Sequence, residues 1–125
     1  METIEVLYSP NYGAGWYTWN QNYPQLLVDP EIIKIVKEYD VQLELHSRYS
    51  EQYKELCSNK QEVITRYVEN TYSENIYCGG ARYLTVLEVD IGDRILIGHR
   101  DGFESVSFDS RGIDPELILL KYFNK

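Results

Sequence analysis

The chain has 125 residues, of which 43% are hydrophobic and 26% charged. This composition is typical of one globular domain and unlike that of a disordered segment. Its formal net charge of −8 repels phosphate backbones and argues against direct nucleic-acid binding. The longest apolar stretch, residues 117–120, is far too short to span a bilayer. We therefore expect a single domain over residues 1–125 that does not associate with a membrane.

The cysteines and tyrosines bear on location and binding. Cys57 and Cys78 are far apart, and the acidic first residues lack the features of an export signal, so we expect a cytoplasmic protein with reduced thiols. Twelve tyrosines suit half-buried positions, interfaces and ligand pockets, and they favour a homo-oligomer that buries an exposed patch. An AT-rich genome explains the same tyrosine content without any function.

The first half of the chain predicts one strand followed by helices. Residues 3–8 alternate in polarity and predict a strand, and a segment rich in Pro, Asn and Gly follows over residues 9–16. Asp29-Pro30-Glu31 has the cap, the proline and the acidic residue of a helix start. Helical spacing then indicates a helix near 48–57, a break at Ser58-Asn59 and a helix over 61–72.

The second half predicts mostly strands. Residues 75–78 are expected to be extended, and residues 83–89, 94–98 and 104–108 to form an antiparallel meander with turns at Gly92-Asp93 and Asp101-Gly102. Asp114-Pro115-Glu116 repeats the helix-start signal and predicts a closing helix, with an edge strand as the alternative. This order predicts an α+β fold, in which a mostly antiparallel sheet is covered on one face by two or three helices.

Residues 12–20 form the most distinctive segment, with four aromatic residues around two glycines. Glycine lets a backbone approach a ligand, exposed N–H groups can bind anionic oxygens, and aromatic faces can stack on a base or pack against a protein. We expect Trp16 to lie in the core and Trp19 to lie partly at a binding or oligomer surface. The alternative is a loop that serves only to fill the core. The candidate binding residues are Tyr12, Gly13, Gly15, Trp16 and Trp19.

Two further segments contribute candidate binding residues. Gly79 and Gly80 can form a bulge or an anion-binding nest to which Arg82 adds charge, or they can simply make a tight connection. In the third segment, Arg100, Asp101 and Glu104 are expected to project polar groups from one end of the sheet. The simpler interpretation of Asp101 is that it belongs to a hairpin turn.

The sequence offers little support for catalysis or metal binding. His46 and His99 each stand alone, and together with Cys57 and Cys78 they lack the spacing of a zinc site. Serine does not occur in a nucleophile elbow, and histidine is not near either cysteine in sequence. We therefore expect no cofactor and no metal, although catalytic partners can still converge in space.

The run from Tyr8 to Asn20, Tyr-Ser-Pro-Asn-Tyr-Gly-Ala-Gly-Trp-Tyr-Thr-Trp-Asn, resembles the opening of small uncharacterised proteins encoded by phages and prophages. In those proteins a helical middle, a Gly-Gly segment and a strand pair with Asp-Gly and Glu-Ser follow. The corresponding elements here are Gly79-Gly80 and residues 101–105. The resemblance covers three short blocks and implies no specific activity. It implies a context, because phage accessory proteins of this size often blunt bacterial immunity.

Together these observations favour a phage-type accessory binding protein that neutralises a component of host defence. In one version the glycine–aromatic loop and the Gly-Gly-x-Arg segment enclose a nucleotide-derived immune signal. In the other, the acidic surface and exposed aromatic residues occupy a host defence protein. The alternatives are a small hydrolase that acts on such a nucleotide and a structural or regulatory phage protein without a ligand.

Overall fold

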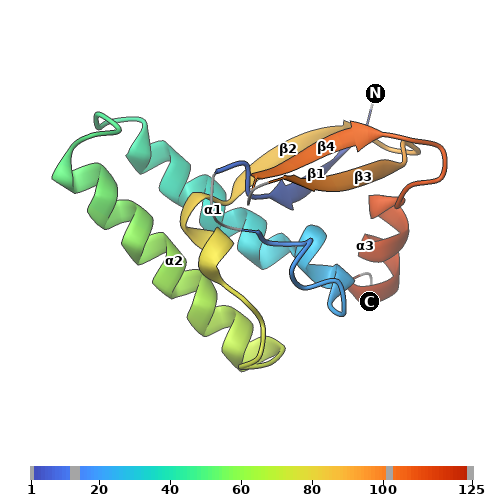
Figure 1. Cartoon of the computed structure of the whole chain (residues 1–125), viewed down its shortest axis with the longest axis horizontal. Helices are drawn as coiled ribbons and strands as arrows, with labels where there is room; N and C mark the ends of the chain where they lie inside the picture. The colour runs from blue at the N-terminus through green and yellow to red at the C-terminus, as the bar shows by residue number, and fades with distance from the viewer. Residues whose placement is uncertain (1, 12–14, 101–102, 124–125) are drawn as a thin grey trace.

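The computed structural model describes residues 2–11, 15–100 and 103–123. Its elements in chain order are β1 (Thr3–Tyr8), η1 (Pro24–Leu27), α1 (Pro30–Leu43), α2 (Glu51–Thr71), η2 (Gly79–Tyr83), β2 (Thr85–Asp90), β3 (Ile95–Arg100), β4 (Phe103–Phe108) and α3 (Pro115–Phe123). Figure 1 shows the long helices α1 and α2 side by side, with the strands beside them and α3 near the end of the chain. The predicted α+β class is confirmed.

The strands form two small antiparallel sheets. In the first, β1 pairs with β2 so that Thr3 lies opposite Asp90, and in the second, β3 pairs with β4 so that Ile95 lies opposite Phe108. The expected meander is therefore wrong in its strand order, because β2 pairs with the N-terminal strand and not with β3. Gly92, whose φ of 96° favours glycine, lies in the turn after β2. Residues 75–78 are not a strand either.

Helix α2 is continuous, so the predicted break at Ser58-Asn59 is wrong. Serine and asparagine in a helix interior cost only a fraction of a kcal/mol relative to better helix formers. The helix also gains a side-chain cap, because Ser50 accepts a hydrogen bond from the Tyr53 N–H. Its buried stripe runs across the expected break from Cys57 to Val68, and packing of such a stripe outweighs weak local propensity.

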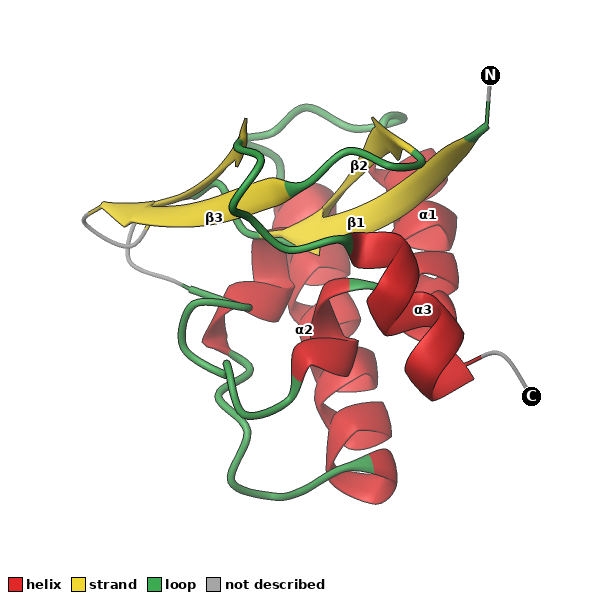
Figure 2. Cartoon of the chain, turned by 90° about the vertical axis from the view of Figure 1, so that its right-hand side faces the viewer, coloured by secondary structure: helices red, strands yellow, loops and turns green. Residues whose placement is uncertain are grey.

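Two apolar clusters hold the layers together. The first joins β1 to the paired helices α1 and α2 and includes Leu7, Trp16, Ile32, Val36 and Ile64. The second joins the other side of β1 to the β3–β4 hairpin and α3, through residues such as Val6, Val89 and Ile95. Figure 2 shows the strands as a layer over the helices. The first sheet is therefore packed on both faces, which explains why Val6 and Leu7 are both fully buried.

Both predicted Asp-Pro-Glu helix starts are confirmed. Asp29 accepts hydrogen bonds from the N–H groups of Glu31 at 2.9 Å and Ile32 at 3.3 Å, and Asp114 accepts one from Glu116 at 3.0 Å. The closing element is thus a helix and not an edge strand. None of the helices in the described ranges has both the length and the apolar composition needed to cross a membrane.

Candidate functional site

The loop after β1 is held by a buried carboxylate from the hairpin. Glu104 is 2% exposed. Its Oε1 accepts a hydrogen bond from the Ser9 N–H at 2.8 Å, and its Oε2 accepts from Trp16 N–H at 2.8 Å, Thr18 N–H at 2.9 Å and Thr18 Oγ1 at 2.8 Å. The loop does bind an anionic oxygen through its N–H groups, but that oxygen belongs to the chain itself. Glu104 therefore fixes the loop and does not project from the end of the sheet as expected.

The two tryptophans of this loop have opposite environments. Trp16 is fully buried, and its Nε1 donates a hydrogen bond to the Leu26 carbonyl oxygen at 2.8 Å. Trp19 is 53% exposed. The predicted division between a core tryptophan and a surface tryptophan is confirmed. Because the Trp16 side chain is fully buried, the two indole rings do not line a common ligand cavity.

Trp19 belongs to an exposed group of rings, which we call the Trp19 platform: Trp19, Tyr77 and His99. The rings of Trp19 and Tyr77 stack with centroids 4.9 Å apart. Trp19 Nε1 donates a hydrogen bond of 3.0 Å to His99 Nε2. Tyr77 is 37% exposed. Three residues from distant parts of the sequence thus form one aromatic surface.

Three predicted glycines serve close packing beneath this platform. A Cβ added at Gly15 would lie 1.9 Å from Trp19 Cδ1, and one at Gly79 would lie 2.1 Å from the Tyr77 hydroxyl oxygen. One at Gly80 would lie 2.3 Å from the Gly15 carbonyl oxygen. The structure therefore brings the Gly15 and Gly79-Gly80 segments together, as the binding hypothesis required. These glycines leave room for the rings of Trp19 and Tyr77 and for the Gly15 backbone. Gly79 and Gly80 thus form the tight connection that was the simpler alternative.

Asn20 links the loop to the Tyr77 segment through its side-chain amide. Sequence reasoning did not identify this residue. Its side-chain amide donates to the carbonyl oxygens of Trp16 and Tyr77, each at 2.8 Å, and its Oδ1 accepts from the Tyr77 N–H at 2.9 Å. These bonds tie the loop to the segment before η2. A single asparagine at the end of an aromatic run carries no sequence signal for such a distant partner.

The remaining predicted residues lie elsewhere or outside the described part. Arg82 is directed away from the platform: its guanidinium donates to the Lys54 carbonyl oxygen at 3.4 Å and to the Tyr83 hydroxyl oxygen at 3.3 Å. Arg100 is exposed at the end of β3. Tyr12, Gly13 and Asp101 lie outside the described residues, and so does the hairpin turn predicted at Asp101-Gly102.

The Lys54 carbonyl and the Tyr83 hydroxyl that accept hydrogen bonds from Arg82 belong to two residues that line a surface hollow of about 410 Å³, which we call the Tyr–Arg hollow. The hollow lies between the first turns of α2, the connection before them and the end of η2. Its lining is rich in tyrosines and cations and consists of Asn11, Arg48, Tyr49, Tyr53, Lys54, Cys57 and Tyr83. Sequence reasoning placed no site here, because residues 41–59 showed no motif.

Positive charge is concentrated around Cys57 at the wall of this hollow. Burial raises the pKa of the Cys57 thiol, and the nearby charges of Lys60, Arg82 and Arg48 oppose that increase. Lys60 is 2% exposed and donates a hydrogen bond of 3.2 Å to the Leu84 carbonyl oxygen. Burial lowers the pKa of Lys60, with Asp40 acting in the opposite direction. Four of the chain's twelve basic residues thus gather in this one region.

A neighbouring hollow brings one histidine near two carboxylates. His46, Asp40 and Glu44 line it, and it shares Arg48 and Tyr53 with the Tyr–Arg hollow. Burial raises the pKa of Asp40. Within the described residues, however, a hydrogen bond does not link His46 to either carboxylate.

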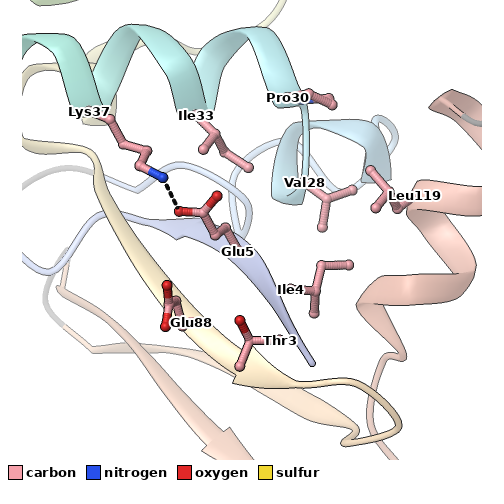
Figure 3. Close-up of a pocket in the computed structure, with 9 residues that line it drawn as sticks. All are labelled: Thr3, Ile4, Glu5, Val28, Pro30, Ile33, Lys37, Glu88 and Leu119. Carbon is pink, nitrogen blue, oxygen red and sulfur yellow. Dashed lines mark hydrogen bonds and ion pairs between the residues drawn. The ribbon is translucent and has the colours of Figure 1, made fainter. Parts of the chain in front are cut away.

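A third depression, shown in Figure 3, lies between α1, β1 and α3. Glu5 and Glu88 are directly opposite each other in the sheet, and Lys37 Nζ lies 2.7 Å from Glu5 Oε2. The hydrogen bond and charge of Glu5 raise the pKa of Lys37. Cross-strand carboxylates repel one another, so Lys37 offsets this repulsion while joining α1 to the sheet.

The buried carboxylate of Asp29 has a structural role of the same kind as that of Glu104. Besides capping α1, it accepts hydrogen bonds from the hydroxyl groups of Tyr67 and Tyr72 at the end of α2. Burial, the Asp29 charge and this hydrogen bond raise the pKa of Tyr67 to about 12, and burial together with the Asp29 bond also raises that of Tyr72. The Asp29 carboxylate thereby links the start of α1 to the end of α2 through hydrogen bonds.

Among the described residues, histidine, cysteine and carboxylate side chains do not form a group that could hold a metal ion. Cys57 and Cys78 are free thiols, the first buried and the second half-buried. Comparisons with protein-family models, curated proteins and solved structures found no significant match.

Proposed function

We propose that this chain is a protein-binding module that neutralises a host defence protein by covering part of its surface with the Trp19 platform. The observation that carries the proposal is a half-exposed tryptophan held in a fixed position by its own chain. Tryptophan and tyrosine dominate the energetics of protein interfaces. The resemblance to phage proteins supplies the proposed context of host defence.

The platform is fixed before any partner arrives, which favours binding. Glu104 anchors the backbone on both sides of the loop, and the Trp19 ring packs closely over Gly15, stacks on Tyr77 and bonds to His99. A side chain that is already ordered loses little conformational entropy on binding. If the loop only filled the core, the ordered position of the half-exposed Trp19 ring would have no structural purpose.

The charge of the chain indicates the chemistry of the partner. A net charge of −8 accelerates encounter with a basic surface and disfavours an acidic one. We therefore propose a partner with a basic face, such as the nucleic-acid-binding side of a host defence protein. Covering that face would neutralise the partner without any chemical reaction.

Affinity capture from bacterial lysate with matched variants tests this proposal. Trp19→Ala removes the exposed ring, whereas Val41→Ala removes an apolar side chain that is 67% exposed on α1. We expect quantitative mass spectrometry to find a protein that the wild type and Val41→Ala retain and Trp19→Ala loses. Equal retention of every captured protein by Trp19→Ala would show that the platform is not the binding surface.

A further inference from the structure

We infer that the Tyr–Arg hollow is a second, independent binding site for a small ligand of the nucleoside phosphate class, with a planar aromatic ring and an anionic phosphate group. The inference goes beyond the proposed protein-binding function, because the hollow shares no residue with the Trp19 platform. It rests on cations that lack a close carboxylate partner, on tyrosine rings of which that of Tyr49 is exposed, and on the size of the hollow.

None of the three cations at this site has a close carboxylate partner among the described residues, although the Arg82 guanidinium donates to two protein oxygens. Within the described part of the chain, neither Arg48 nor Arg82 lies within 4 Å of a carboxylate oxygen, and Lys54 has only a long contact of 3.8 Å with Glu51. Unpaired arginines are unexpected in a chain in which acids outnumber bases by eight. The guanidinium group is planar and presents paired N–H donors, which match two oxygens of one phosphate.

The tyrosines supply aromatic faces beside these cations. Tyr49 is 90% exposed although it lies at the hollow, while Tyr53 and Tyr83 are half-buried in its wall. The guanidinium carbon of Arg82 lies 5.7 Å from the centroid of the Tyr83 ring, and this contact helps to hold the arginine in place. A heterocyclic ring that stacked on Tyr49 would cover apolar surface that now faces water.

The size and the wider charge of the chain limit the ligand to a small molecule. A volume of about 410 Å³ falls in the range of small-ligand sites, roughly 300–1,000 Å³. The adjoining hollow presents Asp40 and Glu44, and the whole chain is acidic. A long polyanion would meet this repulsion along its length, whereas a mononucleotide reaches only the local cations.

Titration calorimetry on the whole protein tests the ligand class with three kinds of probe. ADP, GDP and UDP carry both a ring and a diphosphate, adenosine carries only the ring, and pyrophosphate carries only the charge. We expect at least one nucleoside diphosphate to bind about tenfold or more tightly than either partial probe, with affinity that falls as salt rises. The inference is wrong if none of the three diphosphates binds at roughly millimolar concentration.

Variants assign the site within the fold. We expect Arg48→Ala with Arg82→Ala to weaken nucleotide binding about tenfold or more, while Arg66→Ala, which removes an exposed arginine paired with Glu62 elsewhere on α2, leaves it unchanged. Tyr49→Ala should weaken binding and Tyr49→Phe should restore it, because phenylalanine keeps the stacking face. Equal binding by wild type and Tyr49→Ala, or by pyrophosphate and the tightest diphosphate, would overturn the ring assignment. An equal loss with Arg66→Ala would overturn the site assignment.

Discussion

The glycine–aromatic loop and the Tyr–Arg hollow differ in how their polar groups are used. In the loop, the N–H groups of Ser9, Trp16 and Thr18 all bond to the buried Glu104 carboxylate, so these three N–H groups are not free to bind a ligand. At the hollow, the lining residue Arg48 and the adjacent Arg82 lack a carboxylate partner among the described residues. The distinctive glycine–aromatic motif therefore serves mainly to build the loop. The segment around Arg48, which has no recognisable motif, keeps cationic groups that a ligand can contact.

The largest effect that tests this comparison should come from Glu104. Glu104→Ala leaves buried N–H donors without an acceptor, and each such group costs about 1–3 kcal/mol. We expect the free energy of unfolding, measured with urea, to fall by roughly 4 kcal/mol or more. Glu88→Gln on exposed β2 surface is the control and should change stability by less than about 1 kcal/mol. A small loss for Glu104→Ala would show that the carboxylate does not hold the loop.

Substitutions of the two tryptophans compare the core-facing and the surface-facing side of the loop. Trp16→Ala removes a fully buried ring and should cost roughly 3–5 kcal/mol. Trp19→Ala removes a half-exposed ring and should cost about 1–2 kcal/mol, from the apolar area that remains buried. Similar losses for both variants in urea unfolding would contradict the separation into a core side and a surface side.

Asp29 should give the next effect. The loss of an N-cap alone costs about 0.5–2 kcal/mol, but Asp29→Ala also leaves two tyrosine hydroxyl groups without their acceptor. We expect a total loss of about 2–4 kcal/mol. Asp114→Ala, which lacks the tyrosines, is the matched control and should stay within the range for a cap. Equal losses in the free energy of unfolding for the two variants would show that the hydrogen bonds from Tyr67 and Tyr72 to Asp29 do not stabilise the fold.

Much of this architecture follows from local patterns, and the exceptions share a cause. The Asp-Pro-Glu caps, the strand over residues 3–8 and the division between Trp16 and Trp19 were predicted correctly from the local sequence. The pairing of β1 with β2, the bonds of Glu104 to the loop and the grouping of Arg48 with Arg82 join residues far apart in the chain. A single sequence carries no periodicity or spacing signal for such contacts.

A smaller effect should appear at alkaline pH. The pKa of Tyr67 is raised to about 12 and that of Tyr72 is also raised, so the folded state favours the neutral phenols. Their contribution is fully present below the ordinary tyrosine pKa near 10 and is lost as the pH rises through the folded values. We expect the urea midpoint to fall between pH 10 and 12, and Tyr67→Phe with Tyr72→Phe to flatten that fall. An unchanged pH profile in the double variant would exclude this linkage.

Fluorine NMR tests the proposed function most directly. A chain labelled with 5-fluorotryptophan has two fluorine signals, one each from Trp16 and Trp19, and Trp19→Phe assigns them. On addition of the purified partner identified by affinity capture, we expect the Trp19 signal to shift or broaden while the Trp16 signal keeps its position. A Trp19 signal that stays unchanged while the partner is bound would contradict the claim that this loop presents its outer tryptophan to another protein.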